Sequence, residues 1–395
     1  MAFVDLKTDY AGQKSRIFNL ALVTGVFTVV TVGFYRFWMK TRMRRYYWSA
    51  IRPGGLPLEY VGTPTEKLLG FFTAVVFLAF YIGIVNLILM FFSFSLFEGT
   101  APAYAVSVVG LTPMIFFAQY RARRYVLART RWRGIRFGLE PGVAGFVWRS
   151  MLHWTLTVVT AGLYWPVKTY YLEKYRVDRT YYGDHRLHQG GSWTTLVKPM
   201  IHVYLALVSL VAVVAVTTVT EDPRFAPLGM LGMGWFIYGL AHWKAQSFKA
   251  LTETKTLGEV RLRTAPRTGR IIGIYAGGWA AMFGIFLAAS IAIGIVVAMI
   301  VAAVGSNLFA DIEEGNLAAI PRFVPILFGL LIYFSYFVFW SVLKETFISL
   351  PMMKHFAEVT EIVNPEALLA VRQRARDEFA EAEGFADALP LGDAF

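Results

Sequence analysis

The hydrophobic positions of the chain gather into long blocks separated by polar stretches. A helix needs about 20 predominantly apolar residues to cross the hydrocarbon core of a bilayer, so each block is a candidate membrane segment. The eight blocks are Ile17–Trp38, Leu68–Phe97, Ala103–Tyr120, Phe146–Val167, Pro199–Val219, Phe225–Trp243, Ile271–Val304 and Phe323–Leu350.

The charges between these blocks are strongly biased. Four basic stretches hold 28 of the 38 Lys and Arg residues, and three other connections are mainly acidic. Because Lys and Arg concentrate in cytoplasmic loops, we expect the basic stretches and both termini inside and the acidic connections outside. The basic stretches are Arg36–Lys67, Arg121–Arg149, Lys168–Lys198 and Lys244–Arg270, and the acidic connections contain Glu98, Glu221 and Glu313.

This sidedness requires that the first and fourth blocks enter and leave by the same face; the alternative is that both blocks span the membrane, which gives eight crossings. Both contain a Thr- and Gly-bearing run, TVVTVGFY at Thr28–Tyr35 and TVVTAGLY at Thr157–Tyr164. Gly costs a helix interior about 1 kcal/mol relative to Ala, so we expect helix breaks at Gly33 and Gly162. The predicted fold is an all-α polytopic membrane protein with six spanning helices, two re-entrant or interfacial helices and short cytoplasmic β-hairpins.

Two of the basic stretches alternate in residue character about a Gly, which predicts hairpins at Thr130–Phe137 and Thr254–Leu262. The same order of segments occurs twice, which indicates an internal repeat. Each copy begins with the first or the fourth block, followed by a basic stretch, two crossings and a second basic stretch. The expected parts are a cytoplasmic N-terminus (1–16), a first repeat (17–145), a second repeat (146–270), a partial third repeat (271–362) and a cytoplasmic C-terminal helix and tail (363–395).

The first Thr–Gly run and the text after it, TVVTVGFYRFWMKTRMRRYY, resemble the YjgN family of bacterial inner-membrane proteins. The shared signature is a Gly-containing turn, a Trp, a basic cluster and a Tyr, here Gly33, Tyr35, Trp38, Lys40, Arg42, Arg44, Arg45 and Tyr46, then Tyr60 and Gly62. Val32 stands where Leu is usual, and the second copy keeps only Gly162, Tyr164, Trp165 and Lys168. The resemblance implies the bacterial inner membrane, no assigned function, and a membrane zinc metallopeptidase as a candidate partner.

The charge and composition of the chain limit the classes of partner that we expect. The net charge of +12 is explained by sidedness, so we expect no nucleic acid. The basic and aromatic clusters are either topology determinants with an aromatic belt or a pocket for anionic lipid headgroups. The candidates for such contacts are Trp38, Lys40, Arg42, Arg44, Arg45, Tyr46, Arg121, Arg123, Arg124, Trp165 and Lys168, and Arg129, Arg131, Arg133 and Arg136 extend the second cluster.

Polar residues inside the apolar blocks either join helices by hydrogen bonds or line a cavity. They are Asn86, Arg149, His153, His202, Tyr204, Tyr333 and Tyr336. No Asp or Glu lies in the middle of a block, which disfavours a carboxylate proton relay. Asp184, His185 and His188 lack the spacing of a zinc motif.

We therefore expect no metal, no cofactor and no enzyme, because the chain has no cysteine and no catalytic motif. Two functions are favoured over a third alternative, a membrane enzyme, which no motif supports. One is a conduit for a small solute or lipid, and the other is a scaffold that binds a membrane-protein partner and anionic lipid through its basic loops. The oligomeric state is not predicted.

Overall fold

The computed structural model describes residues 5–97, 100–304 and 323–375. It divides into two compact units. Unit 1 contains the described parts of Met1–Ala11, Arg44–Gly269 and His355–Phe395, and unit 2 contains Gly12–Met43 and Arg270–Lys354.

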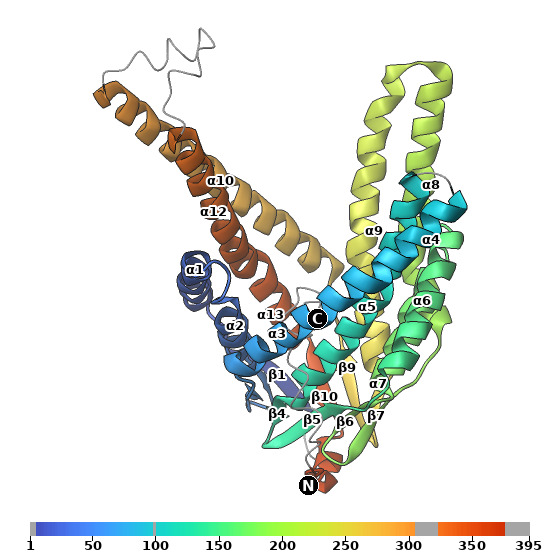
Figure 1. Ribbon diagram of the computed structural model, residues 1–395. Coiled ribbons are helices and arrows are strands. Elements are labelled where there is room, and N and C mark those ends of the chain that lie inside the picture. Colours follow the sequence, from blue (N-terminus) through green and yellow to red (C-terminus); the bar gives the residue numbers. More distant parts are fainter. Residues whose placement is uncertain (1–4, 98–99, 305–322, 376–395) are drawn as a thin grey trace. The chain divides into compact units, whose positions relative to one another are not determined.

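Unit 1 is organised by one sheet of ten strands in the order β2-β1-β10-β9-β8-β7-β6-β5-β4-β3, with every neighbouring pair antiparallel (Figure 1). The outermost strands, β2 and β3, are joined by the turn of residues 54–57, so the sheet curls into a nearly closed barrel. The strands are β1 Leu6–Tyr10, β2 Ile51–Pro53, β3 Leu58–Tyr60, β4 Thr130–Trp132, β5 Ile135–Leu139, β6 Thr180–Tyr182, β7 His185–Gln189, β8 Lys255–Leu257, β9 Val260–Thr264 and β10 Thr360–Val363.

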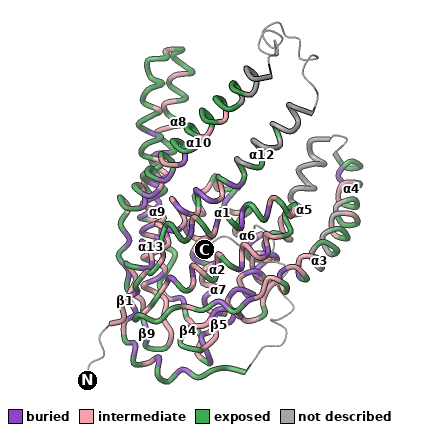
Figure 2. The backbone as a smooth tube through the Cα atoms, turned by 90° about the vertical axis from the view of Figure 1, so that its left-hand side faces the viewer, coloured by how far each residue is buried: buried purple, intermediate pink, exposed green. Residues whose placement is uncertain are grey.

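The helices of unit 1 are excursions that leave one strand and return to the next. They are α3 Pro64–Phe80, α4 Leu87–Phe97, α5 Thr100–Ala128, α6 Val143–Val159, α7 Trp165–Val177, α8 Val197–Thr220 and α9 Ala226–Glu253, with a π-helical turn η1 Tyr81–Asn86 and the 3₁₀ turns η2 Trp193–Leu196, η3 Pro223–Phe225 and η6 Pro365–Ala370. Helices α8 and α9 form a long hairpin, along which Figure 2 shows mainly exposed residues.

Unit 2 is helical over its described residues. It contains α1 Lys14–Val30, α12 Phe323–Lys344, the π-helical turn η5 Glu345–Ser349 and all but the first two residues of α10 Thr268–Val304. Helix α2 Arg36–Ala50 begins here and enters unit 1 at Arg44, and α13 Leu350–Glu358 enters unit 1 at His355. Its core packs Ala21 of α1 against Val338 and Val342 of α12.

Four helices, α5, α7, α9 and α13, lead into strands of unit 1 by the same local geometry. A Thr at the helix end donates its hydroxyl to the carbonyl oxygen four residues earlier, at 2.7 to 2.8 Å, which satisfies one of the acceptors that a helix end leaves open. The four residues are Thr130, Thr180, Thr254 and Thr360.

Three of the strand pairs are tight hairpins. Two-residue turns join β4 to β5, β6 to β7 and β8 to β9, and each turn contains a Gly with positive φ, at Gly134, Gly183 and Gly258. Gly is favoured there because such turns need left-handed backbone. Apolar side chains from separate strands, including Trp132, Tyr182 and Val260, form the core of the sheet.

A buried ion network holds α5, α7 and β8 together. The carboxylate of Glu173, 12% exposed, accepts hydrogen bonds from Lys255 Nζ at 2.8 Å and Arg176 at 2.7 Å. Burial alone would raise the pKa of Glu173, but the charges of Lys255, Arg176 and Arg123 lower that pKa well below its usual value. Burial lowers the pKa of Arg123 to about 10, so Arg123 keeps its charge at neutral pH.

The expectation of an all-α protein with six spanning helices is wrong. The hairpins expected within Thr130–Phe137 and Thr254–Leu262 do form, as β4–β5 and β8–β9, and both belong to one ten-stranded sheet. Among the described residues, two helical segments are long and apolar enough to cross a membrane by length and composition, Trp193–Thr220 and Thr268–Val296. The block at Phe225–Trp243 has a lower mean hydropathy because it contains four glycines, Trp, Tyr and His.

Some expectations fall partly outside the described residues. Glu98 and Glu313 lie outside them, as does the stretch 376–395 of the expected C-terminal helix and tail. Glu221 lies in the connection between α8 and η3.

Candidate functional site

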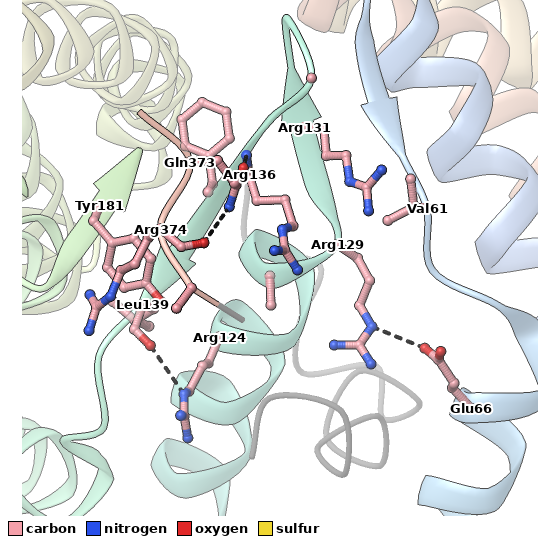
Figure 3. A pocket seen from close by; sticks show the side chains of 14 residues that line it. Val61, Glu66, Arg124, Arg129, Arg131, Arg136, Leu139, Tyr181, Gln373 and Arg374 are labelled. Atoms are coloured by element: carbon pink, nitrogen blue, oxygen red, sulfur yellow. Dashed lines mark hydrogen bonds and ion pairs between the residues drawn. The ribbon is translucent and has the colours of Figure 1, made fainter. Parts of the chain in front are cut away.

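Unit 1 contains a polar pocket of about 560 Å³ (Figure 3). Its walls come from the end of α5, the β4–β5 hairpin, the start of α3, strand β6 and the irregular segment after η6. The lining residues are Val61, Glu66, Arg124, Ala128, Arg129, Arg131, Gly134, Arg136, Phe137, Leu139, Tyr181, Gln373, Arg374 and Ala375.

The charged residues that line the pocket are mostly positive. Five of the fourteen residues are arginines and one is a carboxylate, Glu66. Guanidinium groups are suited to bind phosphate and carboxylate because their planar donors match two oxygens at once. The pocket therefore favours an anion.

Glu66 is engaged with residues of α5. Arg129 Nε donates to Glu66 Oε2 at 3.0 Å, and the hydroxyl of Tyr125 donates to the same oxygen at 3.0 Å. The Arg129 guanidinium lies 4.4 Å from the centre of the Tyr125 ring. Burial, with the nearby Tyr60 and Glu66 adding to it, raises the pKa of Tyr125, so this hydroxyl stays a donor. The single carboxylate is thus held against one wall.

Two further arginines, Arg124 and Arg374, contact uncharged groups. Arg124 Nε donates to the carbonyl oxygen of Leu139 at 3.1 Å, and Arg374 lies over the Tyr181 ring at 4.4 Å. Arg131 and Arg136 face each other across the β4–β5 ladder as register partners. Within the described part of the chain, the buried Nε of Arg131 has no hydrogen-bond partner. What an anion would contact is the set of guanidinium groups that line the pocket.

The segment 371–375 closes one side of the pocket by hydrogen bonds to the sheet. Arg372 and Asp184 exchange two bonds, backbone N–H to carboxylate and backbone N–H to carbonyl, both at 2.9 Å. The backbone N–H of Arg136 donates to Gln373 Oε1 at 2.9 Å. The bond from the Arg372 N–H and then the contact with His185 lower the pKa of Asp184. These contacts bring Arg374 to the pocket.

We expect Gly183→Ala to detach this segment. Both Gly183 and Gly258 open a two-residue turn, at φ 59° and 58°, so Ala should cost each about 1–2 kcal/mol of backbone strain. A Cβ at Gly183 would also clash with the backbone carbonyl oxygen of Arg372, whereas a Cβ at Gly258 would meet open space. Tryptic cleavage after Arg372, followed by mass spectrometry, should be about tenfold faster in Gly183→Ala than in Gly258→Ala. Equal rates would show that Gly183 does not hold the segment.

Of the residues expected to contact lipid headgroups, Arg124 lines the pocket, together with Arg129, Arg131 and Arg136 of the same basic cluster. Arg123 approaches the Glu173 network, and Arg121 lies over the Phe117 ring at 5.2 Å. In the first cluster, Arg44 lies 5.3 Å from the Tyr60 ring in unit 1 and Arg45 donates to the carbonyl of Gly62 at 2.9 Å, also in unit 1. Trp38, Lys40 and Arg42 lie on the unit 2 part of α2, and Tyr46 lies on the unit 1 part of that helix.

The other interface candidates, Trp165 and Lys168, contact each other at the start of α7. Lys168 Nζ lies between the rings of Trp154 and Trp165, 3.4 and 3.3 Å from their centres. Burial lowers the pKa of Lys168 to about 8, so this amine is mostly charged at neutral pH.

In the described part of unit 1, none of the residues expected to line a cavity lines the pocket. In α6, Arg149 lies over the Tyr175 ring and His153 stacks between Tyr164 and Tyr171. In α8, His202 packs against His242, and Tyr204 donates to the Leu163 carbonyl at 3.0 Å. Tyr333 and Tyr336 are exposed on α12 of unit 2, and the side chain of Asn86 lies outside the described ones. These contacts are those of helix packing.

Sequence reasoning missed Glu66, Tyr181, Gln373 and Arg374 as members of a site. Arg129, Arg131 and Arg136 belonged to the recognised basic cluster, and the alternation within the hairpin was the signal that places Arg131 and Arg136 as partners. Glu66 and Arg374 reach the pocket from distant parts of the chain and have no such local signal.

Comparison with known proteins gives a family without an assigned activity. Neither the comparison with curated proteins nor that with solved structures found a match. Residues 5–283 match a family described as bacterial protein of unknown function (DUF898). This match covers well over half of the chain, including most strands of the sheet and the arginines of the β4–β5 hairpin. It is compatible with the YjgN-type resemblance but does not establish that name. The chain belongs to the DUF898 family of bacterial proteins.

Proposed function

We propose that this protein is membrane-anchored and binds the phosphate-bearing headgroup of an anionic phospholipid in the arginine-lined pocket. The observation that carries the proposal is the presence of five arginines and one carboxylate around one pocket of about 560 Å³. A volume of this size accommodates a small molecule or a headgroup. A phosphodiester offers the acceptors that these guanidinium groups need.

Membrane anchoring is supported by apolar side chains that the protein does not cover. On the α8–α9 hairpin, Val211, Val214, Met230 and Leu231 are each at least 65% exposed. Exposed apolar surface of this extent is typical of membrane or protein contact. With the two long apolar segments at Trp193–Thr220 and Thr268–Val296, lipid is the occupant that fits both observations.

We further propose that the sheet, the pocket and both terminal segments lie on the cytoplasmic side of the bacterial inner membrane. Strand β1 pairs with β10, so the first and last strands share one sheet with the pocket hairpin. The basic stretches that form this sheet fit the cytoplasmic face, where anionic lipid is available. No described contact favours a solute conduit or a particular protein partner, so a metallopeptidase partner stays a prediction.

Calorimetric titration of the full-length protein in phosphatidylcholine nanodiscs tests this function. Dihexanoyl phosphatidylglycerol should bind at a saturable single site, with affinity that falls as salt rises because ions screen the charges. Dihexanoyl phosphatidylcholine should not bind. If inorganic phosphate binds as tightly as the phosphatidylglycerol, the ligand is a free anion and the lipid assignment is wrong. If neither the phosphatidylglycerol nor inorganic phosphate binds, the proposed function of the pocket is wrong.

A further inference from the structure

Two helix turns in the protein are copies of one conformation. Residues 31–35 join α1 to α2, and residues 160–164 join α6 to α7. Val32 and Ala161 have φ of 51° and 47°, and the glycines that follow them, Gly33 and Gly162, have φ of 92° and 91°. Positive φ is unusual for a β-branched residue such as Val32. Because both turns have the same geometry, each is a defined turn conformation and not a frayed helix end.

Each turn satisfies its own backbone donors. The N–H groups of residues 31–34 donate to carbonyl oxygens of residues 27–31, and those of 160–163 donate to oxygens of residues 156–160. The fifth donor of each turn, the N–H of Tyr35 or Tyr164, bonds to the hydroxyl of Thr31 at 2.9 Å or Thr160 at 3.1 Å. All five N–H groups of each turn are thus bonded within their own hairpin.

The side chains at the tips of these turns are apolar and exposed. In the first turn Val32 is 89% exposed and Val30 is also largely exposed. In the second turn Val159 is 76% exposed, with Val158 and Leu163 exposed beside it. A tip that has no backbone donor to offer and only apolar side chains to present is poorly matched to water.

Aromatic and basic groups follow each tip. In unit 2, Tyr35 stacks on Trp38 with ring centres 6.0 Å apart, and the Arg42 guanidinium lies 5.7 Å from the Tyr35 ring. In unit 1, Lys168 lies between Trp154 and Trp165. The sequence has no Asp or Glu in residues 14–50 or 143–172. This order of apolar, aromatic and cationic groups matches the layers of an anionic membrane surface.

We propose that each turn inserts its apolar tip into one leaflet of an anionic phospholipid bilayer. The tip reaches the acyl chains to a depth of about 5–10 Å, typical of interfacial segments, while the Tyr, Trp and cationic groups lie at the headgroup level. Hydrocarbon offers no hydrogen-bond acceptors, so a tip in hydrocarbon requires N–H groups that are bonded within the protein, as the N–H groups of both turns are. A protein partner can supply acceptors of its own. The inference is independent of ligand binding in the pocket.

Site-directed spin labelling tests the insertion, because the native chain has no cysteine. The label would be attached to the single variants Val32→Cys and Val159→Cys of the protein. The vesicles would consist of phosphatidylcholine with about 30% phosphatidylglycerol, so that their surface is anionic. Leu56→Cys, in the exposed turn between β2 and β3, is the aqueous control, and Val211→Cys on α8 is the bilayer control.

Both turn labels should be more accessible to oxygen than to a water-soluble nickel chelate, as the Val211→Cys label should be. Their accessibility to the chelate should be several-fold lower than that of the Leu56→Cys label. Chelate accessibility equal to the Leu56→Cys control at both turns would overturn the proposal. Dipolar broadening between turn labels of two molecules would show that a second copy of the chain covers the tips instead, and would also overturn it.

Discussion

Replacement of Glu173 by Gln is expected to lower the free energy of unfolding by about 3–5 kcal/mol. The substitution keeps the shape of the side chain but removes the negative charge that Lys255 and Arg176 contact at 2.8 and 2.7 Å. These cations and Arg123 would then repel one another in a buried site. Denaturant unfolding in detergent, followed by tryptophan fluorescence, measures the loss. Glu259→Gln, at an exposed hairpin turn, is the matched control and should change stability by less than about 0.5 kcal/mol.

The effect of Glu173→Gln should depend on pH with a defined sign. Folding lowers the pKa of Glu173, so its contribution is fully present above the unfolded-state pKa, about 4.3. The contribution is lost as the pH falls toward the lower folded-state pKa. The stability difference between the wild type and Glu173→Gln should therefore shrink on acidification below that value. A difference that stays constant over this range would show that the charge of Glu173 is not the stabilising feature.

The local elements of this fold are readable from the sequence, whereas its architecture is not. The Thr and Gly signals placed strands at Thr130–Phe137 and Thr254–Leu262, because turn chemistry acts within a few residues. Pairing between strands that are far apart in the sequence has no local signal. Strands β1 and β10 pair although their residues Leu6 and Ile362 lie at opposite ends of the chain. Strands of three to five residues are also too short to show a clear period.

The candidate site was predictable to a similar extent. The basic cluster at the end of α5 predicted a headgroup contact at Arg124, which lines the pocket, and Arg131 and Arg136 of the same cluster line it too. The side of the pocket formed by Arg374 depends on closure of the segment after η6 onto Asp184. Such a contact arises from tertiary structure, so the sequence around Arg374 gives no indication of it.

Removal of two pocket arginines should weaken binding of dihexanoyl phosphatidylglycerol by roughly 100-fold. Arg131→Gln/Arg136→Gln removes two charged donors, each worth about 1.5 kcal/mol toward an anion. Arg133→Gln/Arg261→Gln changes the net charge equally at exposed positions outside the pocket lining, and should change the affinity by less than about threefold because exposed charges are screened.

Glu66→Gln should instead increase the affinity for dihexanoyl phosphatidylglycerol. This substitution removes the one negative charge of the lining, while its amide oxygen still accepts the bond from Tyr125. A carboxylate beside a bound phosphate is repulsive, so its removal should tighten binding by roughly tenfold. A gain of affinity is informative because damage to the fold would not produce it.

The dissociation constant of dihexanoyl phosphatidylglycerol, measured by calorimetry for these proteins in the same phosphatidylcholine nanodiscs, tests the central claim most directly. The claim is that the pocket bounded by Arg131, Arg136 and Glu66 is an anion-binding site. It predicts the tightest binding for Glu66→Gln, intermediate binding for the wild type and Arg133→Gln/Arg261→Gln, and the weakest for Arg131→Gln/Arg136→Gln. Equal losses in the two double variants, with no gain in Glu66→Gln, would show that the lipid responds to overall charge and would contradict the claim.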